Sequence, residues 1–395
     1  MSISDPPARV RILFAGYAPV HFVCAYSAWR ELARDPRIEL WLSGGFKRGE
    51  NDAVHYVLDG FYDRFDVDHS RVIPLEDAMA REFDVCICAH LSDAMVPAGA
   101  KKTVQVFHGV SFKNFAVREK ALNFNFLCLP GRYHAEQYQR TGLVRDGGPP
   151  LLITGFPKVD ILAPSRVGSV DRDAMLRGIG LDPGRKTVLY APTGGKDNSL
   201  ELRGEEIIER FADDGRYNLL VKPHDHPKRG INWMQRLAGY ESDRMKLVRD
   251  WDVVPWLAVA DQLITDASSV ATEYTLLDRP IVFMDVPRLL AKVVAKGAPL
   301  DLGTYGRHIG RLVPDKANPM DAVDAGFADP PGQGAHSEKR RQMAAHVFHQ
   351  PGTAAGRVAH VVRYAAGLES DLPADAIRVQ PGVPIPAVAA TSPTA

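Results

Sequence analysis

The sequence predicts an α/β protein with two Rossmann-like, doubly wound domains, each built on a parallel sheet. Short apolar segments alternate with helical segments along most of the chain, which is the pattern of successive βα units. This alternation restarts after a turn-rich segment at residues 163–170. The length of 395 residues also exceeds what one hydrophobic core usually supports. We expect the carboxyl ends of the strands in both domains to face a central cleft, where open α/β sheets bind ligands.

The first domain is predicted to span residues 1–165. Its first strand, residues 10–16, is apolar and ends in glycine, and a helix follows over about residues 21–34. The same apolar character predicts further strands at residues 38–42, 83–89, 102–107, 124–129 and 151–154, with a helix near residues 132–139.

The second domain is predicted to span residues 166–335. Its expected strands are residues 187–190, 217–221, 246–248, 262–265 and 280–284, and its expected helices include residues 205–211, 254–260 and 270–277. Residues 336–368 have an apolar stripe at helical spacing and are predicted to be helices that pack back on the body. Residues 369–395, rich in Pro, Ala, Val and Thr, are predicted to be a disordered tail.

The overall charge does not indicate a polyanionic partner, because Lys+Arg and Asp+Glu both total 48. We therefore expect no nucleic-acid binding, and any anion site has to come from a local cluster. The four cysteines, Cys24, Cys86, Cys88 and Cys128, contain no C-x-x-C pair and are predicted to be buried, reduced thiols. No signal peptide precedes Val10, and the longest apolar run, residues 253–260, is too short to span a bilayer. A cytoplasmic location is expected.

A histidine follows the strand predicted at residues 102–107. His108 precedes Gly109, so its imidazole can be presented at the carboxyl end of the sheet, and its ordinary pKa suits proton transfer. Lys113 makes the segment locally basic. The alternative is a structural histidine with solvated lysines around it.

A second basic segment follows the strand at residues 217–221. It contains Lys222, His224, His226 and two further cations. His224 and His226 could form a metal pair with Asp225, but the cations around them would repel a divalent ion and favour phosphate. A plain solvated loop is the other reading.

Two further strand ends carry hydroxyl groups. Thr193 lies in a glycine-containing loop that matches neither a dinucleotide-binding nor a P-loop motif. Asp266, Ser268 and Ser269 join the strand at residues 262–265 to a helix, and these residue types cap helix N-termini. Exposed backbone N–H groups at such a turn can bind phosphate, although most such turns are ordinary caps. Together, the four strand ends predict a site for a phosphate-containing ligand.

These motifs, in this order, resemble the CDP-glycerol glycerophosphotransferase family, the teichoic-acid primases and polymerases of bacterial envelopes. The matching features are His108-Gly109 with Lys113, Gly155-Phe156-Pro157 with Asp160, Leu189 to Thr193, Lys222 with His224, Ile264 to Ser269, Glu273, and Leu277 to Pro280. The match covers about residues 100–285. Ala267 stands where the family usually has tyrosine, and Asp225-His226 intervenes before Pro227.

The resemblance implies a GT-B fold and transfer of glycerol phosphate, or a related polyol phosphate, from a CDP-linked donor to a hydroxyl acceptor, with release of CMP. In this reading His108 is the base and His224 acts on the diphosphate. The implied donor-binding residues are Lys222, His226, Ser268, Ser269, Glu273, Thr193 and Asp266, and the implied acceptor-side residues are Gly109 and Lys113. No cofactor is required, and a divalent cation such as Mg²⁺ is not indicated.

The resemblance also implies a lipid-linked or glycan acceptor in synthesis of a cell-envelope or capsule polymer. Peripheral association with the inner face of the cell membrane fits such an acceptor, although the sequence has no strong amphipathic basic helix. The nearest alternative is a GT-B glycosyltransferase or UDP-sugar 2-epimerase that uses a uridine nucleotide. A non-catalytic nucleotide-binding protein is the more distant one.

Overall fold

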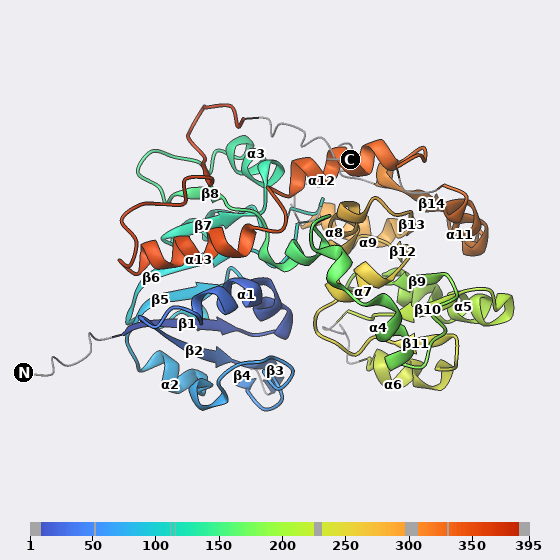
Figure 1. The fold of residues 1–395 in the computed structure, drawn as a ribbon, viewed down its shortest axis with the longest axis horizontal. Coiled ribbons are helices and arrows are strands. Elements are labelled where there is room, and N and C mark those ends of the chain that lie inside the picture. The colour runs from blue at the N-terminus through green and yellow to red at the C-terminus, as the bar shows by residue number, and fades with distance from the viewer. Residues whose placement is uncertain are drawn as a thin grey trace, which may run out of the picture. The chain divides into compact units, whose positions relative to one another are not determined.

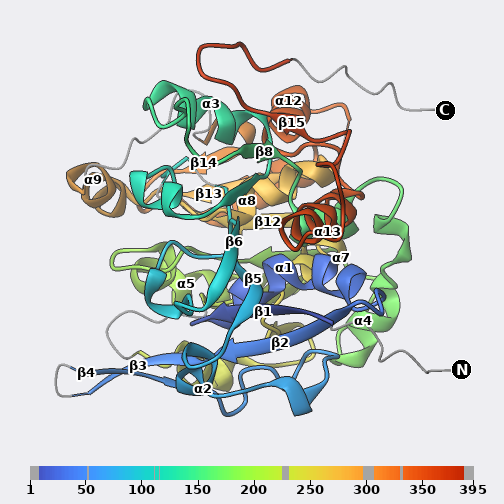
Figure 2. The same ribbon diagram turned by 90° about the vertical axis from the view of Figure 1, so that its left-hand side faces the viewer.

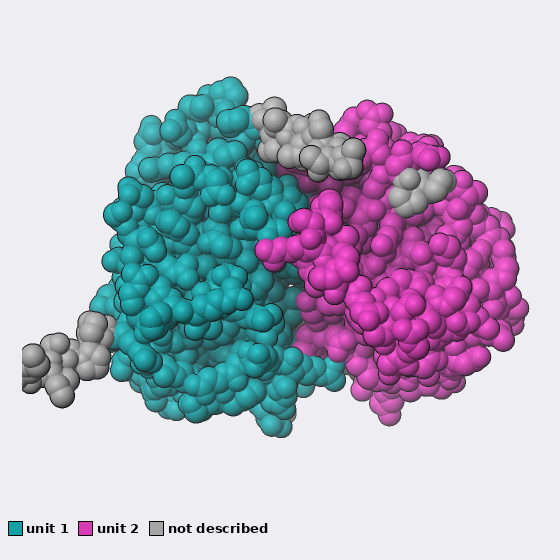
Figure 3. Space-filling view, viewed as in Figure 1, with its two compact units in different colours: residues 1–108, 116–160, 348–395 teal, residues 109–115, 161–347 magenta. Residues whose placement is uncertain are grey.

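The computed structural model describes residues 9–50, 53–110, 112–114, 116–224, 231–296, 307–329 and 332–386. The chain forms two compact units, coloured separately in Figure 3. Unit 1 comprises residues 1–108, 116–160 and 348–395, and unit 2 comprises residues 109–115 and 161–347. Each unit is built around a largely parallel sheet with helices on both faces, so the predicted α/β class is confirmed.

The described residues of unit 1 form a seven-stranded sheet in the order β15-β8-β7-β6-β5-β1-β2 (Figure 1; β15 is labelled in Figure 2). All neighbouring strands are parallel except β15 and β8, which are antiparallel. The strands are β1 (Val10–Gly16), β2 (Ile38–Gly44), β5 (Phe83–Cys88), β6 (Ala100–Val106), β7 (Phe126–Leu129), β8 (Leu151–Ile153) and β15 (Ile377–Arg378).

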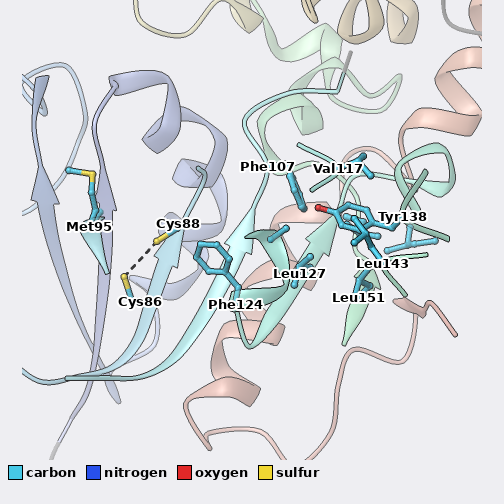
Figure 4. Packing of buried hydrophobic residues seen from close by; sticks show 14 of the residues in the cluster. Cys86, Cys88, Met95, Phe107, Val117, Phe124, Leu127, Tyr138, Leu143 and Leu151 are labelled. Atoms are coloured by element: carbon cyan, nitrogen blue, oxygen red, sulfur yellow. Dashed lines mark hydrogen bonds between the residues drawn. The ribbon is translucent and has the colours of Figure 1, made fainter. Parts of the chain in front are cut away.

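Alternate residues of the unit 1 strands face two different helical layers. Phe14 on β1 packs against Phe22 of α1, whereas Leu13 belongs to the core on the opposite face. That core, which Figure 4 shows from close by, also contains Phe107 and Tyr138. The helices of unit 1 are α1 (Pro19–Leu32), α2 (Leu75–Met79), α3 (Arg132–Arg140) and α13 (Ala354–Ala365).

The cysteines are buried and reduced, as predicted. The Sγ atoms of Cys86 and Cys88 lie 3.8 Å apart on one face of β5, which follows from their spacing of two residues on a strand (Figure 4). Burial raises the pKa of the Cys128 thiol to about 12, so this thiol stays protonated at neutral pH.

In the described part of unit 2, six parallel strands form a sheet in the order β11-β10-β9-β12-β13-β14. Its core on one face joins strand residues such as Val188 and Ile264 to Phe211 of α5. The strands are β9 (Thr187–Tyr190), β10 (Asn218–Val221), β11 (Met245–Leu247), β12 (Gln262–Thr265), β13 (Ile281–Met284) and β14 (Arg311–Val313). The helices are α4 (Arg172–Gly178), α5 (Ser199–Asp214), α6 (Trp233–Leu237), α7 (Val254–Val259), α8 (Val270–Tyr274), α9 (Pro287–Ala295), α11 (Pro319–Phe327) and α12 (Ser337–Val347).

Apart from a start of unit 2 at residue 161 instead of 166, the unit boundaries differ from the predicted domains in two places. Residues 109–115 follow β6 in the chain but belong to unit 2, and the predicted helical segment 336–368 is divided, with α12 in unit 2 and α13 in unit 1. The reason for the second difference is a long-range cap. The Asp160 carboxylate accepts hydrogen bonds from the backbone N–H groups of Gly352, Ala354 and Ala355, which fixes the start of α13.

The prediction of a disordered tail is wrong for residues 369–386. Two residues of this segment, in β15, pair with β8, and the Val379 side chain is buried. The buried Arg357 guanidinium donates to the Asp375 carboxylate and to the Thr154 carbonyl, which ties the segment to the end of β8. These contacts compensate for a composition that by itself does not predict structure. Residues 387–395 lie outside the described part.

His134 offers a test of how unit 1 responds to acid. Its buried ring packs against Phe107 and Tyr138, at centroid distances of 4.5 and 5.6 Å, and burial lowers its pKa to about 3. Because the unfolded chain binds this proton near pH 6.5 and the folded chain does not, stability falls as the pH drops below about 6.5. Between roughly pH 7 and 5, protonation of this histidine in the unfolded chain is expected to lower the free energy of unfolding of the wild type by about 2 kcal/mol. His134→Phe has no ring to protonate at this position, so we expect its free energy of unfolding to fall by that much less over the same range.

Urea titration at the two pH values measures this difference. His69→Phe, the same substitution at an exposed histidine of unit 1, is the control. If the free energy of unfolding falls equally for the wild type and His134→Phe, the folded state binds this proton as readily as the unfolded state.

Candidate active site

In unit 1 the predicted base, His108, lies two residues after β6 and is exposed. Its Nδ1 atom is 2.8 Å from the carbonyl oxygen of Ala89. A carbonyl oxygen only accepts hydrogen bonds, so Nδ1 carries the proton and donates it. The neutral ring therefore has its lone pair on Nε2, the tautomer that a general base at this atom requires.

A group of buried and half-buried rings packs beside His108, and it was not identified from the sequence. The His21 ring lies 5.3 Å from that of His108 and 5.1 Å from that of His90, and Tyr17 contacts both His21 and His90. His90 donates from Nε2 to the Ala15 carbonyl and accepts at Nδ1 from the Ser92 N–H. Both nitrogens of His90 are therefore engaged in the neutral form.

Burial is the main reason that the pKa of His90 is lowered to about 4, and the nearby His108 also lowers it. His90 is thus neutral at physiological pH and adds no charge beside His108. A signal for this group was present in the sequence: Tyr17, His90 and His108 each follow the end of a strand, and β1, β5 and β6 are neighbours in the sheet.

In unit 2 the segment 109–115 brings Lys113 to the loop after β9. The Lys113 Nζ atom donates to the Thr193 hydroxyl at 3.0 Å. The segment is held by α8, because the Thr272 hydroxyl donates to the Val110 carbonyl and a side chain at Gly109 would meet Ser269 Oγ at 3.0 Å. The structure therefore places Gly109 and Lys113, predicted on the acceptor side, among the residues predicted to bind the donor.

Asp266 organises the loops around Thr193. Its buried carboxylate accepts hydrogen bonds from the Thr193 N–H at 2.8 Å and from the N–H and hydroxyl of Ser199, each at 2.9 Å. These contacts join the end of β12 to the loop after β9 and to the start of α5. The geometry makes Asp266 a residue that positions Thr193, and direct donor binding by its carboxylate stays a prediction.

The loop after β10 carries Lys222 and His224. Lys222 is 6% exposed, and its Nζ donates to the Pro223 carbonyl at 3.4 Å. His224 is exposed, and its ring lies on the Gly194 backbone, since a Cβ atom there would be 2.7 Å from the ring. Lys113, Thr193 and His224 are therefore joined by successive contacts in unit 2. The predicted donor residue His226 lies outside the described residues.

The turn before α8 differs from the expected helix cap. Ser269 occupies the N-cap position, but its backbone is already helical and its side chain makes no capping hydrogen bond. Because α8 is only five residues long, its dipole is a weak source of anion binding. Ser268 is 9% exposed and Glu273 is fully buried. Their donor-binding roles stay predictions.

Among the described residues, no three His, Cys, Asp or Glu side chains gather in a way that could hold a metal ion. The described helices also include none that is long and apolar enough to cross a bilayer. In unit 2 the Lys113 side chain contacts the loop after β9, and Lys222 follows β10, the neighbouring strand of the sheet.

Comparison with known proteins decides the family. The sequence profile of the CDP-glycerol:poly(glycerophosphate) glycerophosphotransferases matches residues 76–287, more than half of the chain. The chain belongs to this family. The resemblance drawn from the motifs is thereby confirmed, and the match includes every candidate site residue named above from His90 to Glu273.

Two curated relatives show how much of the family's sequence this chain shares. A teichoic acid poly(glycerol phosphate) polymerase of Staphylococcus epidermidis is 25% identical over 208 residues, which are 46% of this chain and 28% of the polymerase. A teichoic acid glycerol-phosphate primase of Bacillus subtilis is 35% identical over 103 residues, which are 25% of each protein. The matched region is therefore about a quarter of the length of each relative.

Solved structures extend the similarity to nearly the whole fold of this glycerophosphotransferase family member. The wall teichoic acid polymerase TagF has a TM-score of 0.62 and 15% identity, over 92% of this chain and 90% of the TagF chain. A UDP-N-acetylglucosamine 2-epimerase, described as putative, from Listeria monocytogenes has a TM-score of 0.57 and 15% identity, over 93% and 99% of the two chains. At these identities the likeness establishes the shared fold alone, and it confirms the expected fold class.

Proposed function

We propose that this protein transfers glycerol phosphate from CDP-glycerol to a hydroxyl group of an envelope-polymer acceptor and releases CMP. Membership of the glycerophosphotransferase family supports the reaction class. The observation that carries the proposal in the structure is the hydrogen bond from His108 to Ala89, which leaves Nε2 of an exposed imidazole as the basic atom. The solved TagF structures include one that records CDPG, which supports the choice of donor.

The proposed step is a single displacement at phosphorus. The acceptor hydroxyl oxygen attacks the β-phosphorus of CDP-glycerol while Nε2 of His108 removes its proton. The new oxygen–phosphorus bond forms as the bond from the β-phosphorus to the bridging oxygen breaks, and CMP leaves with that electron pair. His108 contributes the base, and the Ala89 carbonyl also stabilises the imidazolium that forms.

Unit 2 supplies the proposed donor site. Lys222 and His224 at the end of β10 neutralise the diphosphate, and Lys113 and the Thr193 hydroxyl bind its oxygens. Ser268, Ser269 and Glu273 at the end of β12 are proposed to contact the donor's phosphate and ribose groups. No cofactor is part of this proposal, and the acceptor is a lipid-linked or glycan chain.

Donor binding provides the experimental test. At about a hundred times its Kd, CDP-glycerol is expected to stabilise the protein by about 2.7 kcal/mol, which raises the melting temperature by roughly 5 °C or more. Lys222→Ala is expected to lose most of this shift, because it removes a buried cation that faces the diphosphate. Differential scanning fluorimetry with CDP-glycerol, CDP-ribitol and UDP-N-acetylglucosamine measures the shifts.

Lys186→Ala is the matched control in the same sheet. Lys186 precedes β9 at the amino end of the sheet, is exposed and pairs with Asp261, so its replacement is expected to leave the donor-induced shift unchanged. A larger shift with the uridine nucleotide than with CDP-glycerol would contradict the proposed donor.

A further inference from the structure

A small hairpin in unit 1 lies next to the rings that pack beside His108. Strands β3 (Phe46–Glu50) and β4 (Ala53–Val57) form a separate antiparallel sheet directly after β2 (Figure 2). Lys47 is opposite Tyr56 in the register, so the two side chains share one face of the hairpin. Lys47 is exposed and Tyr56 is half-buried.

Two glycines set the position of the hairpin. Gly44 has a φ of +117°, and a Cβ atom there would be 1.9 Å from the Gly16 carbonyl oxygen. Gly45 has a φ of +139°, and its N–H donates to the same oxygen at 3.0 Å. Because residues with side chains rarely adopt such backbone angles, this pair lets the chain pass directly beside the end of β1. Tyr17 is the residue that follows that end.

Successive contacts lead from the hairpin to His108. The Lys47 ammonium lies 5.9 Å from the centre of the Tyr17 ring. Tyr17 packs edge-on against His21 at 4.4 Å, and His21 lies 5.3 Å from His108. All of these residues belong to unit 1, so Lys47 and the proposed base lie at the two ends of one row of ring contacts, in which Tyr17 is half-buried and His21 is buried.

The chemistry of Lys47, Tyr17 and Tyr56 suits an anionic polyol. Aromatic faces pack against the C–H groups of a polyol, and an ammonium group pairs with phosphate. Burial, and secondly the neighbouring Tyr56, raise the pKa of the Tyr17 phenol, so its hydroxyl stays a hydrogen-bond donor at neutral pH. Within the described part of unit 1, no carboxylate forms an ion pair with Lys47.

We propose that Lys47, Tyr17 and Tyr56 bind a phosphate group of the acceptor, and that the adjoining polyol reaches His108. The acceptor in this inference is a chain that already carries polyol phosphate. The inference rests on the proposed function only in taking His108 as the base that receives the acceptor hydroxyl. The binding site itself depends on residues that the proposed function does not use.

Calorimetric titration of the full-length protein with a short glycerol phosphate oligomer tests the site. Lys47→Ala is expected to raise the Kd about tenfold, since it removes one charge-assisted contact to phosphate. Lys47→Arg keeps the charge and is expected to stay within about threefold of the wild type. Lys101→Ala is the control and is expected to bind the oligomer normally. Lys101 is an exposed lysine of unit 1 at the start of β6, and it pairs with Asp84.

Equal affinity of the wild type and Lys47→Ala, or no binding by the wild type, would overturn the inference. The proposed function is tested separately, by CMP release from CDP-glycerol with the same glycerol phosphate oligomer as acceptor. If that release is absent while oligomer binding depends on Lys47, the proposed reaction fails and the phosphate site stands. If release occurs and Lys47 has no effect on oligomer binding, the reaction stands and the site fails.

Discussion

Replacement of His108 by asparagine is expected to slow glycerol phosphate transfer by roughly a hundred- to ten-thousand-fold, the usual contribution of a positioned general base. The asparagine amide can still donate to the Ala89 carbonyl, which accepts from Nδ1 in the wild type at 2.8 Å. The change therefore removes the basic Nε2 atom while retaining the hydrogen bond that holds the side chain. Initial rates of CMP release at saturating donor and acceptor measure the effect.

The control for this variant is His69→Asn, at another exposed histidine of unit 1. It is expected to retain wild-type turnover. Both variants should bind CDP-glycerol normally, because the proposed donor residues lie in unit 2. Near-normal turnover of His108→Asn would remove His108 from the mechanism.

Asp266→Asn is expected to destabilise unit 2. One carboxylate oxygen accepts from the Thr193 N–H, and the other accepts from the Ser199 N–H and hydroxyl. In the asparagine variant an NH2 group replaces one carboxylate oxygen. This NH2 group then faces an N–H or O–H group that also donates, so buried hydrogen-bonding groups are left unsatisfied. We expect a loss of about 2–4 kcal/mol in the free energy of unfolding, measured by urea titration.

The same variant is expected to weaken CDP-glycerol binding, because Asp266 positions the loop that contains Thr193. Asp243→Asn is the comparison, since the Asp243 side chain is 78% exposed and its ion pair with Arg244 is long, at 4.0 Å. It is expected to change stability by less than about 0.5 kcal/mol. A similarly small change for Asp266→Asn would show that the carboxylate does not hold these loops together.

The sequence predicted the parts of the fold whose signals are local. Apolar runs such as residues 10–16 and 262–265 are strands because each side of a parallel sheet is covered by helices. Polar residues at the ends of such strands, His108 and His224 among them, were identifiable for the same reason. The strand order then determines which of these ends are neighbours, and that order depends on contacts between distant segments.

Two of the elements that were missed depend on long-range contacts. β15 is two residues long and forms by pairing with β8, so its own sequence has no strand signal. The β3–β4 hairpin contains charged residues and glycine, and its place follows from Gly44 and Gly45. His21 was not singled out because it lies within the predicted first helix, where a histidine has no distinctive spacing.

Two residues of the family motifs stabilise the fold, and the sequence alone could not distinguish this role from a catalytic or binding role. Asp160 caps α13 from about 190 residues away, as the carboxylate bonds to residues 352–355 show. Asp278 accepts hydrogen bonds from the side chains of Ser337 and Arg340, which holds α12 in unit 2. A motif match therefore marks residues that build the fold as well as residues proposed to act on substrate.

Product analysis with a donor panel tests the central claim most directly. The protein is incubated with a bacterial lipid extract and with CDP-glycerol, CDP-ribitol or UDP-N-acetylglucosamine, and products are identified by mass spectrometry. We expect CDP-glycerol to give CMP together with acceptor molecules that have gained whole glycerol phosphate units, and His108→Asn to give neither at a comparable rate. Release of UDP from the sugar nucleotide, with CDP-glycerol left intact, would contradict the proposed function.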